Sequence, residues 1–141
     1  MNLKEARKHV DLAKKQGESA ATSSWEPEDA AGCVTNAFYA YENLIVAVAE
    51  AYGRTWAPSH YKKADLASEL FRDKILSTDL HDTLLRMNDL RKDVSYGEPG
   101  EELETTDLEE IIAKLESCCD EVDSIVAKLE QWGANNELGN A

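Results

Sequence analysis

The sequence predicts an all-α protein, built as an antiparallel, up-and-down bundle of four to five helices. Three observations lead to this fold class. Apolar residues recur at intervals of three and four through most of the chain, which is the spacing of one face of a helix. Capping residues precede the apolar stretches, and glycine or proline separates them. No stretch of alternating apolar and polar residues is long enough to indicate a strand.

The first two helices are predicted from their starting residues. We expect the first to run from Leu3 to about Ala21, with Asn2 as its N-cap. The second is expected from about Pro27 to Tyr52, because proline suits a first helical turn. This second helix is the most apolar one, so we place it at the centre of the bundle.

The next two helices also begin after capping residues. Ser59 is expected to cap a third helix from Tyr61 to about Ile75. The segment Ser77–Asp79 is expected to cap a fourth helix, which ends before Gly97. Five apolar residues of this region share one helical face, namely Leu76, Leu80, Leu84, Met87 and Val94. Arg91 falls on the same face, where its charge is costly unless a carboxylate, a partner subunit or a phosphate satisfies it.

The last helix is expected after a capping box formed by Thr106 and Glu109. Its apolar residues alternate by threes and fours up to Trp132, and the residues from about Gly133 are expected to form a frayed tail. Its other face carries many acidic residues. Such a face is usually solvated, although it can also dock a basic partner.

Length and charge limit the classes of function. The chain of 141 residues suits one domain, residues 1–141, and its net charge is −13. Residues 98–130 hold 12 acidic and 2 basic residues. This distribution argues against tight, non-specific nucleic-acid binding but leaves room for a local basic site. No apolar run reaches the ~18 residues of a membrane span. We therefore expect a soluble, cytoplasmic protein without membrane partners.

Familiar catalytic and metal-binding motifs are absent from the sequence. There is no glycine-rich phosphate loop, no pair of histidines at zinc-binding spacing and no nucleophile elbow. The three cysteines lack metal-ligand spacing, so we expect reduced thiols, no metal and no cofactor. The histidines His9, His60 and His81 are isolated in the sequence, and we interpret them first as helix-surface residues.

The segment Arg91–Gly97, which reads RKDVSYG, resembles the signature end of a HEPN domain. HEPN domains are small helical bundles whose motif is an arginine, a following polar residue and a histidine about five positions later. The aromatic- and alanine-rich segment Asn36–Leu44 resembles the early helix of that family, and Ser59–Tyr61 resembles the start of its next helix. The resemblance covers about residues 27–132, and the arginine motif is its specific part.

This resemblance implies a dimer in which two arginine motifs meet. In active HEPN families the arginine holds the scissile phosphate of RNA and the histidine moves a proton, without metal. By position, Arg91 would be the phosphate ligand and Asp93 a neighbouring polar residue, with Lys92 and Arg86 as further binding candidates. Tyr96 stands where the histidine is expected, and a tyrosine ordinarily titrates near pH 10 whereas a histidine titrates near 6.5. Arg91 and Tyr96 are thus the catalytic candidates within the motif. The tyrosine in place of the histidine favours a non-catalytic member of the family.

Three functional interpretations follow from the sequence. The first is a homodimeric HEPN-like protein that binds RNA or nucleotide, or acts as a partner in a toxin–antitoxin or defence-type system. The second is a structural interaction module, in which an acidic helix docks a protein partner and Arg91 fixes the fold by pairing with Glu42 or Asp93. The third is an active, metal-independent ribonuclease that uses Tyr96 or His81.

Overall fold

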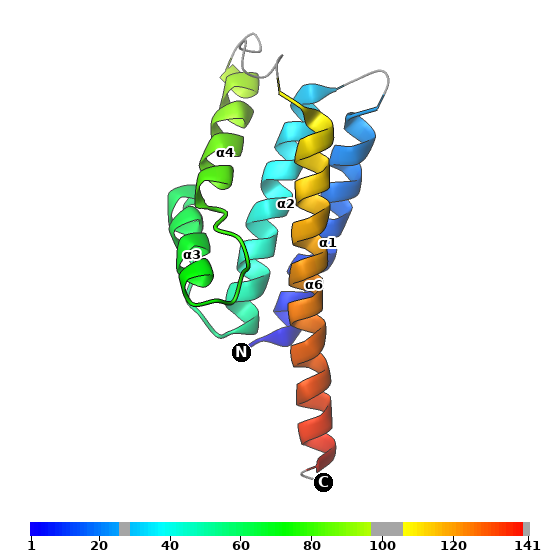
Figure 1. Ribbon diagram of the computed structural model, residues 1–141, viewed down its shortest axis with the longest axis vertical. Helices are drawn as coiled ribbons and strands as arrows, with labels where there is room; N and C mark the ends of the chain where they lie inside the picture. Colours follow the sequence, from blue (N-terminus) through cyan, green and yellow to red (C-terminus); the bar gives the residue numbers. More distant parts are fainter. Residues whose placement is uncertain (26–28, 97–105, 140–141) are drawn as a thin grey trace.

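The structure is a computed structural model that describes residues 1–25, 29–96 and 106–139, with only the backbone described for residues 94–96 and 136–139. Its helices are α1 (Leu3–Ser23), α2 (Ala30–Ala51), α3 (His60–Arg72), α4 (His81–Tyr96) and α6 (Leu108–Gly139). Figure 1 shows that the four longer helices alternate in direction along the chain, with the shorter α3 beside α4. The predicted all-α, up-and-down bundle is therefore confirmed.

Side-chain caps fix the starts of several helices. Asn2 and Ser59 each accept a hydrogen bond from the backbone N–H three residues later, at 3.1 and 3.4 Å. Asp79 Oδ1 accepts one from the His81 backbone N–H at 3.0 Å, and this bond lowers the pKa of Asp79. Each cap satisfies a helix N–H that has no partner inside its helix. The predicted caps of the first, third and fourth helices are confirmed.

Two predicted boundaries of α2 and α3 were wrong. α2 begins at Ala30 instead of Pro27, because Asp29 Oδ1 accepts a hydrogen bond from the N–H three residues later at 2.9 Å. Residues 26–28 themselves lie outside the described part. α3 ends at Arg72 instead of Ile75. Lys74 adopts a φ of 62°, the left-handed conformation that follows many helix ends.

Both ends of α6 also differ from the prediction. The cap is Asp107, one residue after Thr106, because Asp107 Oδ1 accepts a hydrogen bond from the Glu110 N–H at 3.2 Å. The helix continues to Gly139, so the expected frayed tail from Gly133 was wrong. A glycine inside a helix costs only about 1 kcal/mol relative to alanine, which one residue of an otherwise continuous helix can sustain.

α2 is the centre of the bundle, as predicted. It packs against α1, α3, α4 and α6, and most of its residues are buried. α1 and α6 lie on one side of α2, whereas α3 and α4 lie on the other (Figure 1). α4 and α6 both pack on α2 but have little direct contact with each other.

The apolar face predicted for the fourth helix is part of this core. Leu76, Leu80, Leu84 and Met87 are all buried, while the side chain of Val94 lies outside the described part. None of the three cysteines forms a disulfide, as expected. Among the described residues, no helix is both long and apolar enough to cross a lipid bilayer.

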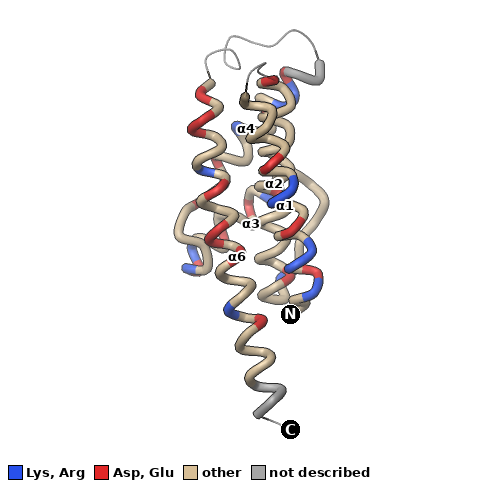
Figure 2. Tube along the Cα trace, turned by 90° about the vertical axis from the view of Figure 1, so that its right-hand side faces the viewer, with Lys and Arg blue, Asp and Glu red and all other residues tan. Residues whose placement is uncertain are grey.

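Ion pairs join α1 to α6. Arg7 Nη1 lies 2.6 Å from Asp123 Oδ1, and Arg7 Nη2 lies 2.7 Å from Glu130 Oε1. Lys14 Nζ lies 2.5 Å from Asp123 Oδ2. Figure 2 shows basic residues along α1 and acidic residues along α6. Hydrogen bonds from Lys14 and Arg7 hold the pKa of Asp123 below its usual range. Part of the acidic face of α6 is therefore neutralised within the chain.

Candidate functional site

Arg91, near the end of α4, lies against aromatic residues of α2. Its guanidinium carbon is 5.1 Å from the ring centre of Phe38 and 5.7 Å from that of Tyr39. Nε and Nη2 of Arg91 donate hydrogen bonds to Asn88 Oδ1, at 3.3 and 2.8 Å. Asn88 lies one turn earlier on α4. The aromatic faces and the amide together hold the planar guanidinium in one orientation.

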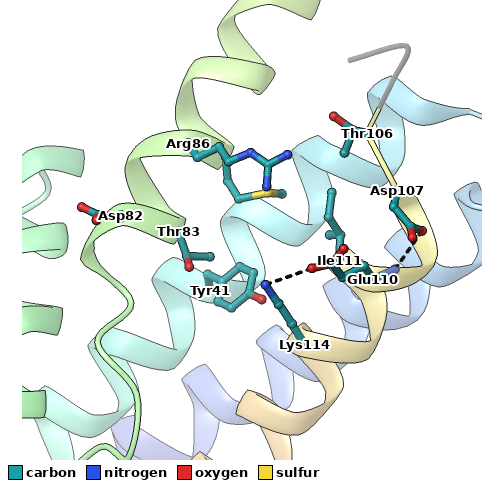
Figure 3. A pocket seen from close by; sticks show the side chains of 10 residues that line it. Tyr41, Asp82, Thr83, Arg86, Thr106, Asp107, Glu110, Ile111 and Lys114 are labelled. Atoms are coloured by element: carbon teal, nitrogen blue, oxygen red, sulfur yellow. Dashed lines mark hydrogen bonds and ion pairs between the residues drawn. The ribbon is translucent and has the colours of Figure 1, made fainter. Parts of the chain in front are cut away.

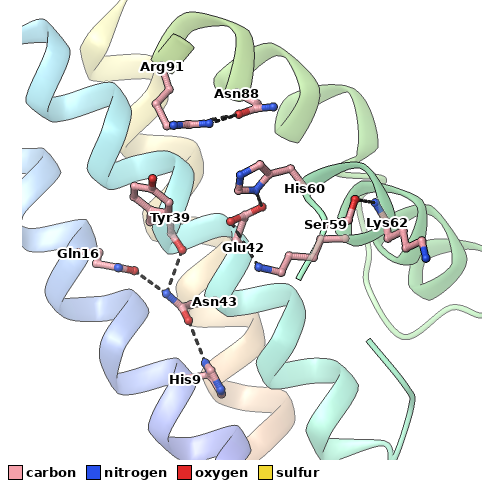
Figure 4. A network of polar contacts seen from close by, with 11 residues as sticks. His9, Gln16, Tyr39, Glu42, Asn43, Ser59, His60, Lys62, Asn88 and Arg91 are labelled. Carbon is pink, nitrogen blue, oxygen red and sulfur yellow. Dashed lines mark hydrogen bonds and ion pairs between the residues drawn. The ribbon is translucent and has the colours of Figure 1, made fainter. Parts of the chain in front are cut away.

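A histidine and a carboxylate lie next to this arginine. Glu42 of α2 is only 5% exposed. Its Oε2 is 2.6 Å from His60 Nδ1, and its Oε1 is 3.5 Å from Lys63 Nζ (Figure 4). The His60 ring meets the Phe38 ring edge-on, with 5.2 Å between the ring centres. The His60 ring and the Arg91 guanidinium thus both contact the Phe38 ring, so these two groups lie close to each other.

We call this group the Arg91 cluster; its members are Phe38, Tyr39, Glu42, His60, Asn88 and Arg91. In the part of the chain that the structure describes, Glu42 and Asn88 are the buried residues with a charged or amide side chain, and both belong to the cluster. Burying such groups costs free energy unless their hydrogen-bonding atoms are satisfied. Their concentration at one place marks the cluster as the strongest candidate site.

Cations and aromatic rings continue from the cluster across α3 and α4. Lys92 Nζ is 5.6 Å from the ring centre of Tyr61, and Lys63 Nζ is 5.7 Å from that of Trp56. The Tyr61 side chain is exposed, so its ring is accessible. Arg91, Lys92 and Lys63 supply three cations to these contacts, whereas Glu42 supplies one carboxylate. Three cations are therefore grouped at this surface, with Glu42 and Glu50 as nearby carboxylates, in a chain whose net charge is −13.

The structure corrects the pairing expected for Arg91. Glu42 does not pair with Arg91, because its two oxygens face His60 and Lys63. Asn88 is the described partner of the Arg91 guanidinium instead. Glu42 lies on α2 and contacts the cluster through its short contact with His60.

The other residues predicted from the motif lie in different surroundings. Lys92 is near the cluster, and Asp93 is exposed on α4. The side chain of Tyr96 lies outside the described part. Arg86 lines a separate pocket between α4 and α6. The predicted binding set is therefore only partly brought together around Arg91.

His81 does not share this site within one chain. It begins α4, ten residues before Arg91, which corresponds to about 15 Å along a helix axis. Its Nδ1 is 2.9 Å from Asp82 Oδ1, and this contact raises the pKa of His81. His9 bonds Asn43 at 2.9 Å, away from Arg91 (Figure 4). His60 is thus the histidine of the cluster.

The sequence analysis did not single out the pairing of His60 with Glu42. A signal for Glu42 existed, because this carboxylate follows Phe38 by four residues within the most apolar stretch and therefore shares its helical face. A signal for His60 was its position directly after the Ser59 cap, where a helix starts. The contact between them joins two helices, and no local pattern predicts it.

The Arg91 cluster is suited to bind an anion. A guanidinium carries five N–H donors that suit a phosphate or carboxylate, and here its Nε and Nη2 also donate to Asn88. The contact of His60 Nδ1 with Glu42 leaves Nε2 as the ring nitrogen that can face a ligand. Among the described residues, no group of three or more histidine, cysteine or acidic side chains is placed to hold a metal ion.

No model of a known protein family matches this chain, and no curated protein shows significant similarity to it.

Proposed function

We propose that this chain is a HEPN-like protein that binds RNA or nucleotide by holding a phosphate group at Arg91, without cleaving it. The observation that supports this proposal most strongly is that two buried polar residues take part in the Arg91 cluster. Asn88 accepts hydrogen bonds from the Arg91 guanidinium, and Glu42 contacts His60, whose ring packs on Phe38 as the guanidinium does. A side chain that serves only packing would not need two buried polar groups beside it.

The surface around the cluster also suits a single-stranded nucleic acid. Arginine contacts phosphate oxygens through paired donors, and exposed aromatic rings stack on unpaired bases. Tyr39 and Tyr61 are both exposed, and each lies beside a cation, Arg91 and Lys92 respectively. A local group of cations of this kind supports binding although the chain as a whole repels phosphates.

The absence of cleavage is proposed from Tyr96. A phenol that titrates near pH 10 is a poor general base at neutral pH, whereas an imidazole that titrates near 6.5 is a good one. Tyr96 occupies the position of the motif histidine in the resemblance to HEPN domains. The proposed homodimer, and a role beside a toxin–antitoxin or defence partner, rest on the same resemblance and remain predictions.

The test is binding of a fluorescently labelled, mixed-sequence single-stranded RNA in the presence of a chelator. Arg91→Ala should weaken binding by about ten- to a hundredfold, since hydrogen bonds to charged groups contribute about 1.5–3 kcal/mol. Arg91→Lys should fall between the wild type and Arg91→Ala, because lysine keeps the charge but not the paired donors. The matched control is Arg72→Ala, which removes an exposed arginine of α3 and should leave binding unchanged.

Three results would change this proposal. Equal binding by Arg91→Ala and Arg72→Ala would remove Arg91 as the anchor. Cleavage of the RNA by the wild type, but not by Arg91→Ala, would show a metal-independent ribonuclease and refute the non-catalytic interpretation. Cleavage only by Tyr96→His would instead support a binding site that derives from a nuclease.

A second candidate function is docking of a basic protein partner on α6. Glu109, Glu116 and Asp120 are exposed on this helix, which favours such a surface. The acidic surface that is open to a partner is smaller than the sequence suggests, because Asp123 and Glu130 form ion pairs with Arg7 of α1. Replacing the three exposed acids by glutamine should abolish capture of a basic partner and leave RNA binding unchanged.

A further inference from the structure

A pocket of about 200 Å³ lies between α4 and α6, away from the Arg91 cluster. It exists because both helices pack on α2 but hardly on each other. Thr83 and Arg86 of α4 line one wall, and Ile111 and Lys114 of α6 line the other (Figure 3). Met87 of α4 also lines the pocket. The pocket shares no residue with the Arg91 cluster.

Tyr41 of α2 forms the floor of this pocket. Its side chain is 1% exposed, and it makes no hydrogen bond to the described residues. Figure 3 shows its hydroxyl directed into the pocket, toward α6. No fully buried side-chain nitrogen or oxygen of the described residues lacks a hydrogen-bond partner, so the Tyr41 oxygen is open to the pocket and can contact a ligand there. Burial raises the pKa of Tyr41, so the phenol keeps its proton and acts as a donor.

The carboxylates at the rim already have partners. Asp107 caps the first turn of α6, and Glu110 Oε1 lies 3.1 Å from Lys114 Nζ. The rim thus carries acidic and basic side chains together, with Arg86 on the α4 side. A bound anion would gain little from this mixed rim and would be repelled by the net charge of −13. These charges favour a neutral ligand.

The remaining surface defines the shape and polarity of the ligand. Met87 and Ile111 are both buried and give the pocket two apolar sides. The hydroxyl of Tyr41 can donate a hydrogen bond to an acceptor on the ligand. A pocket volume of about 200 Å³ has room for a one- or two-ring molecule.

We propose that this pocket binds a small neutral heterocycle of the nucleobase class, whose carbonyl oxygen or ring nitrogen accepts a hydrogen bond from Tyr41. The ring lies between Met87 and Ile111, where apolar side chains contact both of its sides. The site acts independently of phosphate binding at Arg91.

The experiment is calorimetric titration of the full chain with three probes. Uracil and adenine are the neutral probes, and benzoate is the anionic probe. Tyr41→Phe removes only the hydroxyl and should weaken the binding of the better base by about two- to tenfold, the effect of one lost hydrogen bond. Tyr52→Phe is the matched control, because Tyr52 is exposed and lies outside the pocket. Thermal unfolding without ligand reports whether each variant folds.

The outcomes decide the proposal in both directions. Saturable binding of a base that weakens in Tyr41→Phe but not in Tyr52→Phe supports it. Support also requires that Tyr41→Phe without ligand melts no lower than the wild type, since no protein hydrogen bond is lost. The absence of base binding at millimolar concentration would overturn the proposal, and so would tighter binding of benzoate than of either base. None of these results depends on RNA binding at Arg91, so the two proposals can fail separately.

Discussion

Replacing Asp123 by asparagine tests how the acidic last helix is used. In the folded chain the Asp123 carboxylate contacts Arg7 at 2.6 Å and Lys14 at 2.5 Å. Its side chain is 31% exposed, so its surroundings lie between those of a surface pair and a buried one. Exposed pairs contribute up to about 1 kcal/mol, and a carboxylate shared by two cations contributes more. We expect Asp123→Asn to lower the free energy of unfolding by about 1–2 kcal/mol.

This loss converts into a measurable shift of the melting temperature. An unfolding entropy of about 2.1 cal/mol/K per residue gives about 0.3 kcal/mol/K for 141 residues. The melting temperature of Asp123→Asn should therefore fall by roughly 3–7 °C at pH 7. The assay is thermal unfolding followed by circular dichroism, at low salt and in 1 M NaCl, where screening should reduce the difference.

The matched control is Asp120→Asn, which removes an exposed carboxylate from the same helix. We expect this variant to change the melting temperature by less than about 2 °C, as surface substitutions usually do. Equal effects of the two substitutions would refute the ion-pair reasoning. So would a large effect of Asp123→Asn that high salt leaves unchanged.

The pH dependence of stability also tests the ion pairs of Asp123, and the direction of the expected change is defined. The folded-state pKa of Asp123 lies below its usual value, because Lys14 and Arg7 stabilise the charged form. The stabilisation is therefore complete above the unfolded pKa of about 3.9 and is lost as the pH falls through the folded pKa. The wild type and Asp123→Asn should consequently converge in stability as the pH drops below about 3.9.

Two glycines and one buried carboxylate give further predictions. Gly17→Ala should raise the free energy of unfolding by about 0.5–1 kcal/mol, because alanine favours the interior of a helix such as α1 more than glycine does. The new Cβ would lie at an ordinary contact distance of 3.7 Å from Leu115 Cδ2 of α6. Gly32→Ala should instead lower the free energy of unfolding by about 1 kcal/mol, because its Cβ would clash with the Asp29 carboxylate and displace this cap of α2. Urea unfolding of the pair checks both signs, and a stabilised Gly32→Ala would contradict the role of the cap. Glu42→Gln should cost about 1–3 kcal/mol by the same assay, since it weakens the contacts to His60 and Lys63 in a buried position. Glu69→Gln on exposed α3 is its control, and equal losses would show that burial of Glu42 has no effect.

The fold was predictable because its determinants are local. The caps at Asn2 and Ser59 and the apolar face from Leu76 to Met87 could be read from neighbouring residues, and the structure agrees with them. The end of α6 was not predictable in this way. One glycine at position 133 suggested a stop, but a single weak residue does not end a helix that is otherwise favourable.

The candidate site was predictable only in part. Arg91 stood out because its charge interrupts an apolar face, which is a local signal. Its contact with Phe38, and the contact of His60 with Glu42, depend on how α3 and α4 sit on α2. His60 and Glu42 are 18 positions apart in the chain. Such contacts follow from tertiary packing, which periodicity and capping do not specify.

The central position of α2 has a consequence for how the bundle opens. α1 and α6 on one side, and α3 and α4 on the other, both bury their apolar residues against the same helix. Because α1 and α6 contact α2 more extensively than α3 and α4 do, we expect α3 and α4 to be the pair that detaches locally. Backbone amides in the middle of α2 should then exchange with solvent hydrogen only through global unfolding, and those of α3 should exchange earlier. The two proposed binding sites, at the seams of α4 with α2 and with α6, would both stabilise the detachable side of the molecule when occupied.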